Sequence, residues 1–162
     1  MKLAEALVLR ADIQRKLERL QSRVCADALI QEGDEPAEEP SRLIEEFETL
    51  ASQLQGLIYR INATNLETRL DSGESVTAAL ARRDVLQRRL AMFQQLAQAA
   101  TLKNTRYSAS EVRFEPTVNV AEIRSRHDKL AKEHRELDAA IQAVNWKTEL
   151  LETSADESLR SE

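Results

Sequence analysis

The chain is poor in the residues that interrupt helices and strands or that staple loop-rich folds. Its 162 residues include three glycines, three prolines and one cysteine, and aromatic residues make up 4% of the total. A single cysteine cannot form an internal disulfide, and the scarcity of aromatic residues disfavours a β-sandwich. Because glycine and proline are the strongest breakers of regular structure, the chain has few places at which to turn. These absences favour a few long elements over a loop-rich fold.

The chain also lacks a strong net charge and any long apolar run. Its 23 lysines and arginines against 28 aspartates and glutamates give a net charge of −5. A general nucleic-acid-binding protein normally carries a basic face, so we expect no nucleic-acid partner. No run approaches the roughly 20 apolar residues of a membrane helix. Arg10 ends the first apolar run before it reaches the length of a signal peptide. We therefore expect a cytoplasmic protein that does not associate with membranes.

Four stretches of the chain repeat apolar residues at alternating steps of three and four. This spacing is typical of amphipathic helices that pack along their lengths. Pro40 suits the first position of a helix, because its missing N–H has no intrahelical partner there. Gly73 suits a left-handed helix cap between the second and third stretches. The sequence therefore predicts an all-α fold, with long antiparallel helices in a bundle or coiled-coil arrangement.

The predicted boundaries make residues 1–152 a single helical-bundle domain. Its four helices are expected at about residues 2–31, 40–70, 76–103 and 120–152. Asn119 is expected to cap the last of them. A short extended segment, with a β-strand as one option, is predicted over residues 105–118 from the alternation of Val112, Phe114 and Val118 with polar residues. Residues 153–162 are short and polar, and we expect them to form a mobile tail.

Polar residues interrupt the apolar stripes, and antiparallel pairing brings several of them to one end of the bundle. Arg10 and Arg83 each occupy a stripe position at which an apolar side chain is expected. The predicted Arg/Asn cluster consists of Arg10, Gln14, Asn62, Asn65, Arg69, Arg82, Arg83, Asp84 and Asn145. One interpretation is a buried polar network that fixes register and oligomeric state, with Asp84 neutralising an arginine. The other is a binding site for a small anion or carboxylate, because arginines outnumber acids in it.

The remaining candidates for chemistry have simpler interpretations. His127 and His134 are seven residues apart, which is about 10 Å along a helix and too far for one metal ion to bridge. The acidic residues between Glu32 and Glu48 lack the alternating pattern of a calcium-binding loop. Trp146 is expected to be a packing anchor near the end of the last helix. We therefore predict no metal site, no cofactor and no enzymatic activity.

Six stretches of the chain are distinctive when taken together. They read MKLAEALVLRADIQ, NATNLETRLDSG, TAALARRDVLQRRL, RYSASEVRFEPTVNVAEI, REL and NWKTEL. In sum they resemble the septicolysin-like family of small bacterial helical proteins, over essentially residues 1–152. The resemblance implies a helical fold of largely unknown function and, through the name of the family, a pore-forming toxin. It implies no catalytic residues.

Three functions are open at this point. The first is a non-enzymatic helical bundle that self-associates or binds another protein, since slender helices with few aromatic residues bury little surface alone. The second is a binding protein for a small anion or ligand that uses the Arg/Asn cluster. The third, implied by the resemblance, is a membrane-active toxin. We expect the first, with a homo-oligomer as the assembly and another protein as the alternative partner.

Overall fold

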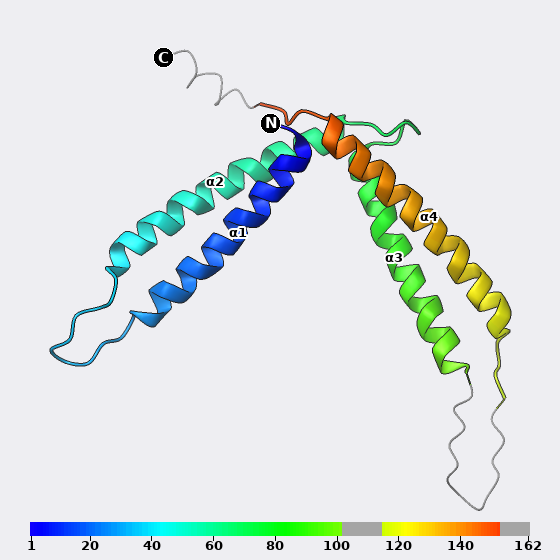
Figure 1. Cartoon of the computed structure of the whole chain (residues 1–162), viewed down its shortest axis with the longest axis horizontal. Coiled ribbons are helices and arrows are strands. Elements are labelled where there is room, and N and C mark those ends of the chain that lie inside the picture. The colour runs from blue at the N-terminus through cyan, green and yellow to red at the C-terminus, as the bar shows by residue number, and fades with distance from the viewer. Residues whose placement is uncertain (102–114, 153–162) are drawn as a thin grey trace, which may run out of the picture. The chain divides into compact units, whose positions relative to one another are not determined.

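A computed structural model of the chain describes residues 1–101 and 115–152, and the other residues lie outside the described part. It contains four helices (Figure 1), which are α1 (Leu3–Ala26), α2 (Pro40–Glu67), α3 (Val76–Ala99) and α4 (Val120–Lys147). Isolated bridges are the only β-type pairing in these ranges. The helices pack against one another in antiparallel pairs, so the predicted all-α bundle fold is confirmed.

The predicted signals for starting and ending helices act as expected. Pro40 is the first residue of α2. The Asn119 side-chain oxygen accepts hydrogen bonds from the backbone N–H groups of Ala121 at 3.1 Å and Glu122 at 3.2 Å, and so caps α4. Gly73 has a φ of 83°, which places it in the left-handed region that glycine tolerates best. The two hydrogen bonds to Asn119 satisfy backbone N–H groups that the start of α4 would otherwise leave without partners.

The helices end earlier than the sequence predicts. α1 ends at Ala26 because the carboxylate of Asp27 accepts hydrogen bonds from the backbone N–H groups of Ala37 and Glu38, at 3.3 and 3.2 Å, and so turns the chain back. α2 and α4 end at Glu67 and Lys147 because the residues that follow enter bridges with other segments. The predicted extended segment, 105–118, lies mostly outside the described residues. Its described part, 115–118, contains no strand.

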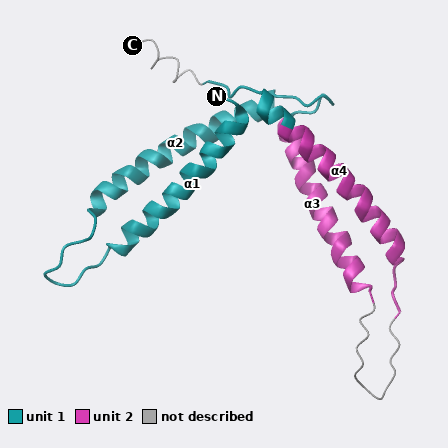
Figure 2. Ribbon diagram, viewed as in Figure 1, with its two compact units in different colours: residues 1–75, 143–162 teal, residues 76–142 magenta. Residues whose placement is uncertain are grey.

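The described chain forms two compact units (Figure 2). Among the described residues, the first unit is 1–75 with 143–152, and the second is 76–101 with 115–142. The first unit contains α1 packed against α2, with the end of α4 beside them. The second contains α3 and most of α4, which lie side by side (Figure 1). The antiparallel arrangement predicted for the helices includes α2 and α3, which fall in different units, and for that pair it stays a prediction.

The core of the first unit is aliphatic. Its buried members are Leu3, Ala6, Ile13, Leu57, Ile61 and Leu150. Those on α1 and α2 belong to the predicted stripes, because steps of three and four return the chain to the same helix face. Burying one such Leu or Ile side chain contributes about 1.5–3 kcal/mol. The second unit has its own buried stripe residues, which are Val76, Ala79, Leu86, Leu137 and Ile141.

The start of the chain is fastened to the end of α4. Leu3 N donates to Thr148 O and Leu150 N donates to Met1 O, both at 2.9 Å. Lys2 Nζ lies 2.6 Å from Glu149 Oε1, and the N-terminal ammonium lies 3.2 Å from Glu149 Oε2. Hydrogen bonds from Lys2 and from the N-terminal ammonium lower the pKa of Glu149. Residues 1–3 therefore form a clasp that holds the two ends of the helical region together.

The connection between α2 and α3 has the same backbone pattern as this clasp. Leu70 N donates to Glu74 O at 2.9 Å, as Leu150 N donates to Met1 O. Arg69 forms an antiparallel bridge with Ser75, as Glu149 does with Lys2. One junction is covalent and the other is made by the N-terminus, but both join the end of a long helix to the start of a shorter one.

The two junctions belong to an internal repeat. α1 and α3 each have 24 residues, and α2 and α4 each have 28. Identical residues recur in α1 and α3 at a spacing of 73 positions: Ala6/Ala79, Leu7/Leu80, Arg10/Arg83, Gln14/Gln87, Arg15/Arg88, Leu17/Leu90 and Gln21/Gln94. Others recur along α2 and α4 at a spacing of 80: Leu50/Leu130, Ala51/Ala131, Leu57/Leu137, Ile61/Ile141, Ala63/Ala143, Asn65/Asn145, Thr68/Thr148 and Leu70/Leu150. We call α1–α2 the first repeat and α3–α4 the second repeat.

Candidate functional site

The residues of the predicted Arg/Asn cluster are divided between the two units. The first unit holds Arg10, Gln14, Asn62, Asn65, Arg69 and Asn145, and the second holds Arg82, Arg83 and Asp84. Five of them are exposed, namely Gln14, Asn62, Arg69, Arg82 and Asp84. Arg69 donates to the carbonyl oxygen of Gly73 at 3.2 Å within the turn that follows α2. The cluster is therefore divided into two groups, one in each unit, and a single site built from all these residues stays a prediction.

In the second unit, the arginines of α3 pair with acids. Arg83 Nη1 lies 3.3 Å from Asp138 Oδ1 of α4, and Arg83 Nη2 lies 3.7 Å from Asp84 Oδ1. Arg82 Nη1 lies 3.5 Å from Glu133 Oε1. The predicted neutralisation of an arginine by Asp84 is present. Glu133 and Asp138 were outside the predicted cluster, although antiparallel pairing of α3 with α4 points to both.

In the first unit, Arg10 lacks the partners that its counterpart has. Arg10 corresponds to Arg83, but Ala11 and Ile58 stand where the second repeat carries Asp84 and Asp138. Arg10 is half-buried, and its Nε is a buried atom with no hydrogen-bond partner among the described residues. Leaving such a donor unsatisfied costs about 1–3 kcal/mol. The two equivalent arginines therefore differ: Arg83 is paired with acids, and Arg10 has no acidic partner among the described residues.

Asn145 is the other residue of the cluster with an unsatisfied buried group. Its side chain belongs to the first unit, the residue is 5% exposed, and Oδ1 has no hydrogen-bond partner among the described residues. Its counterpart, Asn65, is half-buried. Buried amide oxygens are rarely left without a donor. Asn145 and Arg10 are the two members of the predicted cluster that have a buried polar atom without a hydrogen-bond partner among the described residues.

We predict opposite effects when the two equivalent arginines are replaced with methionine. Arg10→Met should raise the free energy of unfolding by about 0.5–1 kcal/mol, because it removes an unsatisfied buried donor. Arg83→Met should lower it by about 0.5–1 kcal/mol, because it breaks exposed ion pairs, which are individually weak. Urea unfolding of both variants measures the two changes. If the two variants changed the free energy of unfolding equally and in the same direction, the buried Nε of Arg10 would not be unsatisfied in solution.

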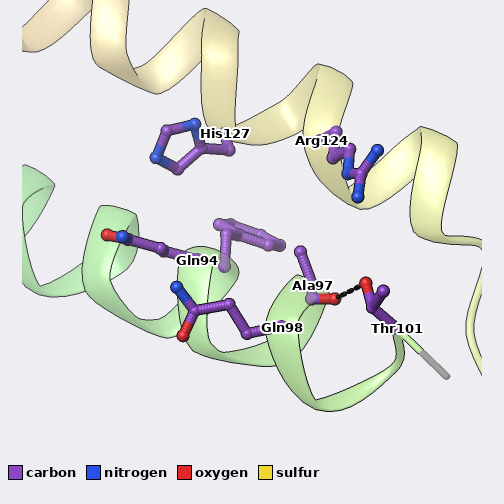
Figure 3. Close-up of a pocket in the computed structure, with 7 residues that line it drawn as sticks. Gln94, Ala97, Gln98, Thr101, Arg124 and His127 are labelled. Carbon is purple, nitrogen blue, oxygen red and sulfur yellow. Dashed lines mark hydrogen bonds between the residues drawn. The ribbon is translucent and has the colours of Figure 1, made fainter. Parts of the chain in front are cut away.

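A small pocket lies between α3 and α4 in the second unit. It has a volume of about 200 Å³ and is lined by Phe93, Gln94, Ala97, Gln98, Thr101, Arg124 and His127. Figure 3 shows His127 and Arg124 reaching into it from α4, with Gln94, Gln98 and Thr101 on the opposite side. The Thr101 hydroxyl donates to the Ala97 carbonyl at 2.7 Å, and His127 Nδ1 lies 3.3 Å from Asp128 Oδ1. The sequence pattern singled out His127 but not this pocket.

Other candidate residues lie apart from any such site. Trp146 is 61% exposed, so its predicted role as a packing anchor is wrong: it lies on the solvent face of α4, where its neighbour Asn145 is buried instead. Cys25 is exposed and free. In the described ranges no group of three or more His, Cys, Asp or Glu side chains is arranged to hold a metal ion. Nor does any helix of those ranges combine the length and the apolar character needed to cross a membrane.

Comparisons with known proteins identify the family and correct the resemblance to septicolysin-like proteins. The model of a family of unknown function (DUF6847) matches residues 10–150. A crystal structure of a functionally unknown conserved protein from Corynebacterium diphtheriae is 40% identical and has a TM-score of 0.88, over 93% of this chain and 99% of that one.

No curated protein matches the chain. Neither the family nor the solved structure carries a link to septicolysin, so the resemblance was wrong and the toxin function that it implied has no support. Five of the six stretches that suggested it lie wholly within the residues that the family model matches. The chain is a member of DUF6847, a family of unknown function.

Proposed function

We propose that this protein is non-enzymatic and acts by binding a protein chain, with a second copy of itself as the partner. The proposal rests on a set of large apolar side chains that are exposed on the surface of the first unit. Tyr59 is 65% exposed, Leu66 is 64% exposed and Trp146 is 61% exposed. Trp and Tyr are enriched among the residues that dominate binding energy at protein interfaces.

The placement of these side chains supports a contact surface over chance exposure. Tyr59 and Leu66 are seven residues apart, so they share one face of α2, and that face is opposite the one that buries Leu57 and Ile61. Leu66 and Trp146 occupy equivalent positions in the two repeats. A single exposed apolar residue needs no explanation. The same exposed position filled twice by a large apolar residue favours a shared role in binding.

Trp146 is the only tryptophan of the chain, and it provides a direct probe of this surface. Its fluorescence emission should shift to shorter wavelength as the protein concentration rises, because association would remove the indole from water. Leu66→Glu should abolish the shift by placing a charge in the contact. Val85→Glu is the matched control, since Val85 is also an exposed apolar residue but belongs to the second unit.

An emission maximum that does not depend on concentration would contradict self-association through this surface. So would an equal loss of the shift in both glutamate variants, because a general effect of added charge would then explain it. Circular dichroism of each variant establishes that the helices are retained.

A second candidate function, the binding of a small anion, is favoured by Arg10. Its Nε is buried without a partner, and the acids that neutralise its counterpart are replaced by Ala11 and Ile58. Phosphate or a dicarboxylate at ten times its dissociation constant would stabilise the folded state by about 1.4 kcal/mol. Thermal melts of the wild type and of Arg10→Met, with and without the anion, test this. An equal response in both proteins would exclude Arg10 as the site.

A further inference from the structure

The pocket of the second unit differs from the equivalent place in the first repeat. Phe93, Ala97, Arg124 and His127 correspond to Leu20, Val24, Ile44 and Phe47. In the first repeat Leu20 is 3% exposed, and Val24 and Phe47 are half-buried. A hairpin of the same helix lengths therefore has apolar side chains at these four positions, although Ile44 is 48% exposed and Gln21 stands at the position of Gln94. The imidazole and guanidinium of the second repeat are not required for such a hairpin.

The exchanges between the repeats change both the volume and the chemistry of this place. Ala97 and His127 are smaller than Val24 and Phe47, whereas Phe93 and Arg124 are larger than Leu20 and Ile44. Smaller side chains open space where the backbone cannot collapse to fill it. The pocket has a volume of about 200 Å³, which is smaller than the roughly 300–1,000 Å³ of sites for drug-sized ligands. It has room for a ligand of one ring.

The lining combines an apolar floor with a single positive charge. Phe93 and Ala97 supply apolar surface, and the ring of His127 adds a second flat surface. Arg124 is exposed and has no ion pair among the described residues. A guanidinium recognises carboxylates through two parallel hydrogen bonds. The amides of Gln94 and Gln98 can donate further hydrogen bonds to the same group (Figure 3).

We propose that this pocket binds a small aromatic carboxylate, with the ring against Phe93 and His127 and the carboxylate at Arg124. The class follows from three features together: the one-ring volume, the aromatic surfaces and the single cation. Because the site lies in the second unit, it is separate from the residues proposed to contact a protein chain, and each proposal can fail without the other.

Benzoate titrated into the full chain tests this proposal. A one-ring ligand should bind with a dissociation constant of roughly millimolar, and chemical shifts of the backbone amides near Ala97 and His127 would report it. The decisive variant combines Arg124→Ile and His127→Phe and so copies the first repeat. It should weaken benzoate binding by about tenfold or more. Its helix content should be retained, because the first repeat already carries these side chains at the equivalent helix positions.

Two controls keep the result specific. His134→Leu also copies the first repeat, at the position of Leu54, but lies outside the pocket lining, so it should leave benzoate binding unchanged. Benzyl alcohol, which has the ring without the charge, should bind the wild type at least about tenfold more weakly than benzoate. Absence of benzoate binding to the wild type would overturn the proposal. Binding of equal strength to the repeat-copying variant, or equal binding of both compounds, would also overturn it.

Discussion

Replacing Ile61 with alanine should destabilise the protein by about 2–5 kcal/mol, which is the range for removing a large aliphatic side chain from a packed core. Ile61 is 1% exposed and belongs to the core cluster of the first unit. Its counterpart Ile141 is also 1% exposed, in the second unit. Ile141→Ala should therefore cost a similar amount. Denaturant unfolding followed by circular dichroism measures both changes in free energy.

Ile44→Ala is the matched control for these core substitutions. Ile44 also lies on α2 but is 48% exposed and is outside the proposed contact residues, so shortening it should change stability by no more than about 0.5 kcal/mol. If Ile61→Ala and Ile44→Ala had equal effects, the stripe of α2 would not be the buried face. If Ile141→Ala had no effect while Ile61→Ala did, the two repeats would not be packed alike.

A circular permutant in which the tripeptide Asp-Ser-Gly replaces residues 151–162 and joins Leu150 to Met1 should be folded. The tripeptide copies residues 71–73, which connect Leu70 to Glu74 across the same hydrogen bond that joins Leu150 to Met1. The new chain would open between Glu32 and Gly33, in the exposed connection between α1 and α2. Its free energy of unfolding should lie within about 1–2 kcal/mol of the parent, because the new loop is short and the ends already meet.

A second permutant provides the comparison. It uses the same linker but opens within α2, between Gln55 and Gly56, where the cut separates Leu54 from Leu57 in the stripe that packs on the core. This variant should lose much of its helix content. If both permutants were equally unfolded in circular dichroism, the junction made by the N-terminus would not be equivalent to the covalent one.

The fold was largely predictable from the sequence because it depends on local patterns. The apolar stripes, Pro40, Gly73 and the Asn119 cap act within one or two helical turns, and each predicted helix is present. The helix ends were less predictable, since they depend on contacts between distant segments. Asp27 ends α1 by bonding the backbone of Ala37 and Glu38, and the bridge to Lys2 follows the end of α4.

The candidate sites were harder to predict because they depend on comparing the two halves of the chain. Arg10 and Arg83 stand out as polar residues in apolar stripes, but their different surroundings appear only when Ile58 is matched with Asp138. The pocket likewise becomes informative when His127 is matched with Phe47. The identities at fixed spacings are visible in the sequence, so the internal repeat can be predicted without the structure.

The exposure of Trp146 shows a different limit of sequence patterns. Asn145 and Trp146 are adjacent, and hydrophobicity alone assigns the tryptophan to the core and the asparagine to the surface. The structure has the opposite arrangement, with Asn145 5% exposed and Trp146 61% exposed. Such an inversion is expected where an apolar side chain serves binding instead of folding.

Sedimentation equilibrium of the full chain at several concentrations is the most direct test of the proposed function. We expect a mass that rises above the 18.4 kDa of one chain as the concentration increases, and that returns to 18.4 kDa when Leu66 and Trp146 are both replaced with glutamate. A wild-type mass of 18.4 kDa at every concentration, up to tens of milligrams per millilitre, would contradict binding to a second copy of the chain.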